Sequence, residues 1–107
     1  MRAEHVAENE SLFRSVNESL VVDRTAVDPE TGRHALLCEC WNTDCVERVW
    51  LARAEYEAAR TDSAQFVVVP GHVDPTVEDV VVSTDRYAVV RKRGEAAEVA
   101  AELDTRT

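Results

Sequence analysis

All three cysteines of the 107-residue chain lie within eight residues, as Cys38, Cys40 and Cys45. In an extended chain Cys38 and Cys40 point to the same face, with Cα atoms about 6.6 Å apart, while Glu39 points away. Two sulfurs in that arrangement can reach one metal ion, and the four residues before Cys45 allow a turn that returns a third. Thiolate and imidazole groups are ligands that zinc prefers, so the cluster predicts a structural zinc site that needs one histidine.

Two histidines are candidates for the fourth ligand. His72 follows Pro70 and Gly71, a rigid turn that would support an imidazole arriving from distant sequence, and Asp74 is near enough to accept a hydrogen bond from its second ring nitrogen. His34 lies four residues before Cys38 and has the same strand parity. The residues favour His72 and leave His34 open as the rival.

The spacing C-x-C-x4-C differs from the common paired C-x2-C pattern, so it is moderately specific for zinc. Unligated buried thiols and a redox-active pair of Cys38 and Cys40 are the alternatives. An odd number of clustered cysteines in a reducing compartment argues against a structural disulfide.

The overall charge narrows the classes of partner. The chain has 12 Lys and Arg against 21 Asp and Glu, a net charge of -9 that repels nucleic acid and anionic lipid surfaces. Its compact basic run, residues 91–93, is interpreted as a solvated strand edge. No apolar stretch is long enough to span a bilayer, and no apolar signal region opens the chain. We therefore expect a cytoplasmic protein that binds neither membrane nor nucleic acid.

Hydrophobic periodicity predicts the elements that position the cluster. Val6, Phe13, Val16 and Leu20 recur at helical spacing and indicate an amphipathic helix over about residues 3–22. The remaining elements follow from apolar runs, helical spacing and turn residues: a turn at 28–32, a hairpin of strands 35–38 and 46–51 with the cysteines near its tip, a helix at 51–60, a strand at 66–69, a hairpin of strands 80–82 and 87–90, and a closing helix with Ala96, Val99 and Leu103.

This order lacks the regular alternation of parallel-sheet folds. It predicts an α+β fold, a small single domain over residues 1–107 with a mainly antiparallel sheet, an N-terminal helix, a short central helix and a C-terminal helix. The last residues, about 104–107, are expected to form a frayed tail.

Several motifs resemble those of a family of small, uncharacterised actinobacterial proteins, and the likeness covers nearly the whole chain. They are N-E-x-L-F-R-x-V-N-E at residues 9–18, Cys38-Glu39-Cys40 with Cys45, Glu55-Tyr56-Glu57, Pro70-Gly71-His72 and residues 94–100. In that family the C-E-C, the later cysteine and the P-G-H motif occur together, so the resemblance favours His72 over His34. It supplies no activity. Ala52 stands where relatives tend to have Thr, and loss of that capping box would weaken the next helix by about 1 kcal/mol.

The sequence predicts a non-enzymatic module for protein interaction or regulation, because four protein ligands leave no position for water or substrate. A protein partner is expected, and the alternative is a thiol redox sensor that uses Cys38 and Cys40. A hydrolytic zinc enzyme with Glu39 or Asp44 as base is disfavoured, since three thiolates make zinc a poor activator of water.

Overall fold

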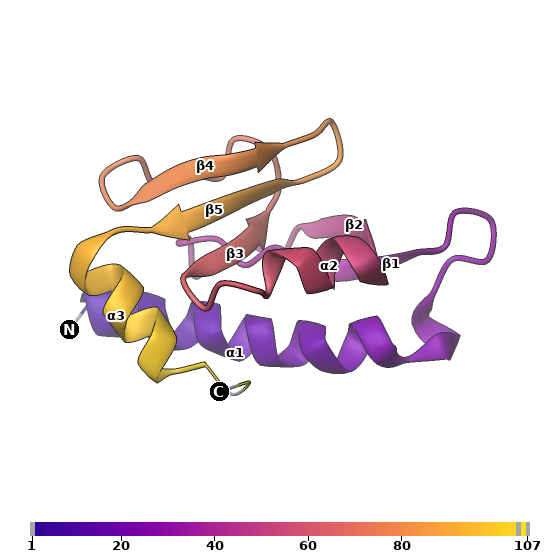
Figure 1. Cartoon of the computed structure of the whole chain (residues 1–107), viewed down its shortest axis with the longest axis horizontal. Helices are drawn as coiled ribbons and strands as arrows, with labels where there is room; N and C mark the ends of the chain where they lie inside the picture. The colour runs from indigo at the N-terminus through magenta and orange to yellow at the C-terminus, as the bar shows by residue number, and fades with distance from the viewer. Residues whose placement is uncertain (1, 105, 107) are drawn as a thin grey trace.

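The long first helix runs along one side of two small antiparallel sheets in the computed structural model, which describes residues 2–104 and 106 (Figure 1). The elements in chain order are α1 (Arg2–Val22), a 3-10 turn η1 (Arg24–Ala26), β1 (Arg33–Leu37), β2 (Arg48–Ala52), α2 (Arg53–Ala59), β3 (Gln65–Val68), β4 (Glu78–Ser83), β5 (Ala88–Lys92) and α3 (Gly94–Glu102). The predicted α+β single domain with N-terminal, central and C-terminal helices is confirmed. Among the described residues, no helix combines the length and apolar character that a membrane crossing requires.

The strands form two sheets in place of the single one expected. β1 pairs antiparallel with β2, from Arg33 opposite Ala52 to Leu37 opposite Arg48. In the other sheet β5 lies between β3 and β4, and all pairings are antiparallel. The central helix begins at Arg53, two residues later than predicted, because Leu51 is fully buried within β2.

Ala52 precedes that helix without a capping side chain. The other half of the capping box is present, because the Glu55 carboxylate accepts a hydrogen bond from the Ala52 amide at 2.8 Å.

The three-stranded sheet contributes to a separate apolar cluster on each face. Val67 and Val89 pack with residues of β1, β2 and α2, including Leu36, Leu51 and Tyr56. On the other face Phe66, Val68, Ala88 and Val90 pack with Ala100 of α3 and with Cys38 and Cys40. The cysteine segment is therefore part of the core.

The most deeply buried side chains of α1 are mainly polar, and the predicted apolar face is only partly buried: Val6, Phe13 and Leu20 are half-buried and Val16 is exposed. Glu10, Arg14, Asn17 and Val21 are at most 2% exposed, whereas Val16 is 38% exposed. The polar side chains satisfy backbone groups that other elements present to the helix: the Arg14 guanidinium donates to the carbonyls of Ser63 at 2.6 Å and Ala100 at 2.9 Å.

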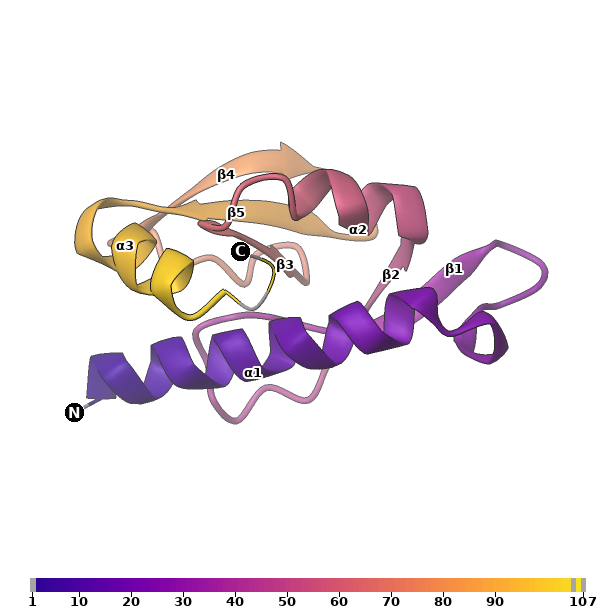
Figure 2. The same cartoon turned by 60° about the horizontal axis from the view of Figure 1, so that its bottom comes forward.

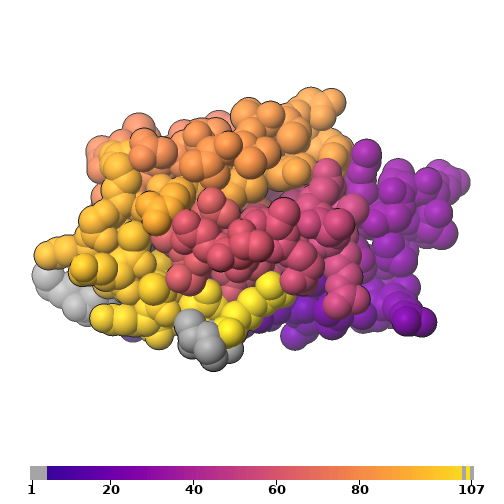
Figure 3. All heavy atoms as spheres, viewed as in Figure 1, coloured from indigo at the N-terminus to yellow at the C-terminus, as the bar shows by residue number. Residues whose placement is uncertain are grey.

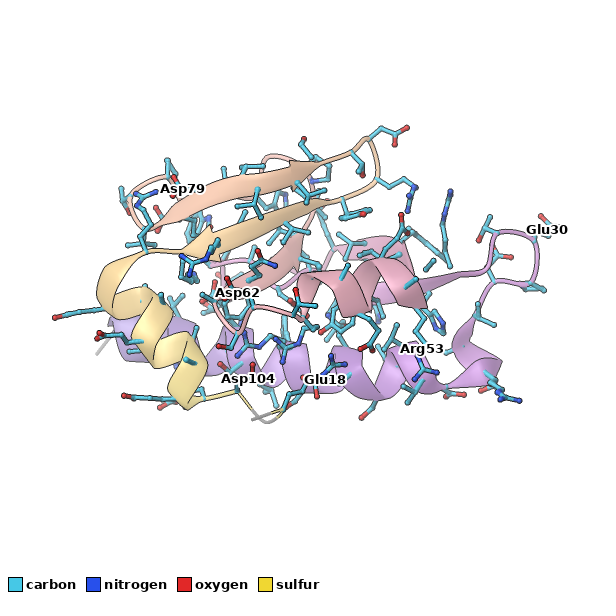
Figure 4. All side chains as sticks on the ribbon, viewed as in Figure 1. Glu18, Glu30, Arg53, Asp62, Asp79 and Asp104 are labelled. Carbon is cyan, nitrogen blue, oxygen red and sulfur yellow. The ribbon has the colours of Figure 1, made fainter. Side chains whose placement is uncertain are left out.

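The C-terminal residues that the structure describes lie against the rest of the domain, and the frayed tail over about residues 104–107 stays a prediction (Figure 3). Asp104 is buried and accepts a hydrogen bond from Arg60 at 2.6 Å, and Glu18 of α1 accepts another from the same guanidinium at 2.8 Å. Figure 4 shows Asp104 and Glu18 beside each other at this contact. Arg106 pairs with Glu57 at 3.0 Å. Residues 105 and 107 of the predicted tail lie outside the described residues.

The basic run at residues 91–93 was wrongly interpreted as wholly solvated. Arg91 and Arg93 are exposed, but Lys92 is 4% exposed. Its ammonium group pairs with Glu10 at 2.8 Å and with Glu78 at 2.5 Å. A lysine can be buried only when such partners replace its water.

Candidate metal centre

The structure brings the four predicted ligands together. The Sγ atoms of Cys38, Cys40 and Cys45 and a ring nitrogen of His72 all lie within 4.8 Å of one another. No other group of this kind occurs among residues 2–104 and 106. His72 Nδ1 lies 3.6 Å from the Cys38 sulfur and 3.8 Å from the Cys45 sulfur. The arrangement is compatible with a single metal ion.

His34, the rival ligand, lies in β1 outside this group. It is 5% exposed and pairs across the strand with Leu51, and its Nδ1 is buried without a hydrogen-bond partner. Of the two histidines that the sequence offered as the fourth ligand, the structure therefore places His72 with the three cysteines and His34 outside the group.

Glu39 anchors the segment between the first two cysteines to the core. Its carboxyl group accepts hydrogen bonds from Asn17 in α1 at 2.8 Å, Tyr56 in α2 at 2.9 Å and the Val67 amide in β3 at 2.9 Å. The alternation of an extended chain explains the arrangement, since it sends Glu39 to the opposite face from its two neighbours. With both oxygens engaged and no exposed surface, this carboxyl is not placed as a catalytic base.

Backbone contacts hold the same segment between the two sheets. The Cys38 amide donates to the Glu47 carbonyl at 3.1 Å, and the Glu39 amide donates to the Val67 carbonyl at 2.8 Å. The Val69 amide donates to the Cys38 sulfur at 3.2 Å. An amide donor of this kind disperses thiolate charge and is typical of the surroundings of a metal-bound cysteine.

A polar turn returns the third cysteine. The Asn42 carbonyl accepts a hydrogen bond from the Cys45 amide at 3.0 Å, and the Asn42 side chain accepts one from the Asp44 amide at 3.0 Å. This Asx turn explains why polar residues occupy the spacer between the second and third cysteines. Asp44 itself is exposed.

The Pro-Gly-His turn directs the imidazole. Gly71 has a φ of +90°, a conformation that favours glycine, and the His72 amide donates to the Val69 carbonyl at 2.9 Å. His72 Nε2 lies 3.0 Å from a carboxylate oxygen of Glu47. In the tautomer with the proton on Nε2, that nitrogen donates to Glu47 and the lone pair of Nδ1 faces the sulfurs, which is the tautomer that a metal ion in the cluster requires.

Glu47 occupies the role that was predicted for Asp74, and that prediction was wrong. Asp74 turns away because its carboxylate accepts hydrogen bonds from Thr76 at 2.6 Å and 3.1 Å.

The pKa values of the three thiols are displaced in different directions. A hydrogen bond from the Cys38 thiol, with help from His72, lowers the pKa of Cys40 to about 5. The same hydrogen bond, together with burial, raises the pKa of Cys38, and burial raises that of Cys45.

Two supporting residues escaped the sequence reasoning to different degrees. The alternation of an extended chain predicted that Glu39 points away from the cysteines. It did not predict that this charged side chain would be buried and would anchor the segment by hydrogen bonds. Glu47 carried no signal in the sequence, because its contact with His72 depends on how a distant loop approaches β2.

The resemblance to actinobacterial proteins stays a prediction: no protein-family model, curated protein or solved structure matches the chain.

Proposed function

We propose that the protein is a small cytoplasmic zinc protein, in which a structural Cys3His site stabilises a non-enzymatic module for protein interaction. The observation that carries the proposal is the separation of the ligand atoms. In a tetrahedral site with zinc–sulfur bonds of about 2.3 Å and a zinc–nitrogen bond of about 2.0–2.1 Å, sulfur and nitrogen ligands lie about 3.6 Å apart. The two sulfur–nitrogen separations of 3.6 and 3.8 Å fit that value.

Zinc in this site has a structural role. Cys38, Cys40, Cys45 and His72 fill its four positions, so none is left for water or substrate. The ion connects the end of β1, the loop to β2 and the loop after β3, three segments with little regular structure of their own. Its binding free energy is then folding free energy for this end of the domain.

The zinc-bound loop presents apolar side chains on the surface. Trp41, next to one ligand, is 39% exposed, and Val46, next to another, is 87% exposed. Interface cores are enriched in aromatic residues and depleted in charge, so a rigid loop with these two side chains suits contact with a protein partner. The net charge of -9 disfavours nucleic acid as that partner.

Metal content tests the zinc site. We expect one zinc ion per purified chain by elemental analysis. Cys40→Ser should lose the ion and lower the temperature of unfolding, while Thr43→Ser, a non-ligand change in the same loop, should keep both. Metal-free wild-type protein with unchanged thermal stability would reject the site.

A pull-down from cell extract tests the interaction separately. Val46→Asp and Trp41→Ser should abolish capture of a specific partner while zinc content stays at one ion per chain. Trp50→Ser is the matched control, since Trp50 is a 44% exposed tryptophan on β2, outside the loop. Equal capture by all variants would exclude this loop as the contact surface.

The second candidate is a thiol redox sensor. It is supported by the proximity of the three sulfurs, since cysteines of a lost metal site would be poised to oxidise. Peroxide titration followed by mass spectrometry separates the candidates. Persistence of reduced Cys38 and Cys40 while bulk thiols are consumed would exclude the sensor.

A further inference from the structure

A groove lies between the N-terminal half of α1 and helix α3, which run beside each other in Figure 2. Its volume is about 820 Å³, within the range of small-molecule sites. The walls are mainly apolar, with Val6, Trp41, Phe66, Val77 and Val99 among them. The groove is separate from the four metal ligands, although Trp41 follows Cys40 directly.

Buried charges lie among these apolar walls. Glu10 and Lys92 both line the groove, yet their residues are only 2% and 4% exposed. The Lys92 ammonium group pairs with Glu10 at 2.8 Å and with Glu78, itself 2% exposed, at 2.5 Å. Burial of three ionisable groups costs free energy that apolar residues of similar volume would avoid.

This cluster is short of one positive charge. Two carboxyl groups, those of Glu10 and Glu78, share one ammonium group, that of Lys92. The nearby Arg93 pairs with the Asp79 carboxylate at 2.7 Å and donates to the backbone carbonyls of Glu78 at 2.9 Å and Pro75 at 2.8 Å.

Two more acids line the groove, Asp74 and the exposed Glu95. The lining therefore carries three carboxyl groups against one ammonium group.

We propose that this groove binds a small organic cation with an apolar body, such as an arylalkyl or alkyl ammonium ion. The apolar walls would take the body of the ligand, and the acidic lining would take its charge. Trp41, which is 39% exposed, is the aromatic side chain of the lining that a cation can approach, since the Phe66 ring is already covered by Arg14 at 4.3 Å and Lys92 at 5.4 Å.

The protonation of Glu10 sets the pH of the binding experiment. Burial raises the pKa of Glu10 to about 7, against the opposing effect of Lys92. A cationic ligand would favour its ionised form and take up the missing charge. Binding experiments are therefore designed at pH 8, where Glu10 is mostly ionised.

The test uses three probes that share a 2-phenylethyl group and differ in charge, on the zinc-loaded protein: 2-phenylethylammonium, 2-phenylethanol and 3-phenylpropanoate. Binding is followed by two-dimensional NMR of 15N-labelled protein. We expect saturable shifts at groove residues, with the ammonium ion bound about tenfold more tightly than the carboxylate. Zinc is measured in the same samples, so loss of the metal is distinguished from loss of the ligand.

Two variants test the acidic lining. Glu10→Gln should reduce the preference for the ammonium ion over the alcohol, and Glu95→Gln, at an exposed position, should reduce it to a smaller extent. Glu8→Gln is the matched control: it removes the same charge from an exposed position of α1 outside the groove. It should leave binding unchanged.

Three results would overturn the proposal. The first is equal affinity for the three probes, or no saturable shift at the groove up to about 20 mM, near the weakest binding expected of a ligand with nine heavy atoms. The second is an unchanged charge preference in both Glu10→Gln and Glu95→Gln. The third is a change in the groove signals on dilution without ligand, which would assign the groove to a second copy of the chain.

Discussion

Replacing Glu39 with glutamine would preserve the size of the side chain and remove its capacity to accept hydrogen bonds at both ends. In the structure one oxygen accepts from Asn17 and Tyr56, and the other accepts from the Val67 amide. The tyrosine hydroxyl can rotate and accept instead. The asparagine cannot reverse, because its amide group both donates to the Leu37 carbonyl at 2.9 Å and accepts from the Leu37 amide at 2.7 Å.

In either orientation of the glutamine side chain, its NH₂ group, which is a donor, therefore faces another hydrogen-bond donor. With the NH₂ group on one side it faces Asn17, and on the other side it faces the Val67 amide. One buried donor is left unsatisfied in each case, which costs about 1–3 kcal/mol of stability. The cysteine ligands on either side are unchanged.

Urea denaturation of zinc-loaded protein measures this cost. We expect Glu39→Gln to lower the free energy of unfolding by about 2 kcal/mol. The exposed change Glu8→Gln should stay within about 0.5 kcal/mol of wild type. A loss for Glu39→Gln no larger than that of this control would refute the anchoring role assigned to Glu39.

Three further predictions concern the two residues that support the His72 ligand and the buried acid Glu10. Glu47→Ala should weaken zinc affinity about tenfold in a chelator competition, because the imidazole ligand loses its orienting carboxylate, whereas Asp44→Ala in the neighbouring loop should not. Gly71→Ala forces a side chain into a backbone with φ +90° and should cost about 1–2 kcal/mol together with zinc affinity; Gly32→Ala, at φ +70° in a distant turn, should cost stability alone. Because burial raises the pKa of Glu10 from 4.5 to about 7, its protonated form is favoured on folding: stability from this group is complete below pH 4.5 and is lost as pH rises through 7. Wild type should therefore lose on the order of 3 kcal/mol more than Glu10→Gln over that interval in urea titrations at several pH values, and parallel pH profiles would contradict the assignment.

The elements and the ligand set could be predicted because they depend on local patterns. Continuous apolar runs rich in β-branched residues locate the strands around Val67 and Val89, and Pro70 with Gly71 marks the turn that carries His72. The thiol spacing restricts the cysteines to one end of a hairpin. None of these inferences requires knowledge of how distant elements pack.

The face of α1 could not be predicted from its apolar residues. Val16 and Leu12 are exposed, while Arg14 and Asn17 are buried because they satisfy carbonyl and amide groups of segments far along the chain. Lys92 was misjudged for the same reason: its partner Glu10 lies 82 residues away. Buried polar residues are specified by partners, and a single sequence does not reveal which partners meet.

X-ray absorption at the zinc edge of the purified protein tests the central claim most directly. The account predicts one zinc ion per chain with three sulfurs at about 2.3 Å and one nitrogen at about 2.0–2.1 Å, and no water oxygen in the first shell. The His72→Ala variant should lose the nitrogen and gain an oxygen or lose the ion. A first shell with fewer than three sulfurs, or with a nitrogen that persists in His72→Ala, would contradict the site formed by Cys38, Cys40, Cys45 and His72.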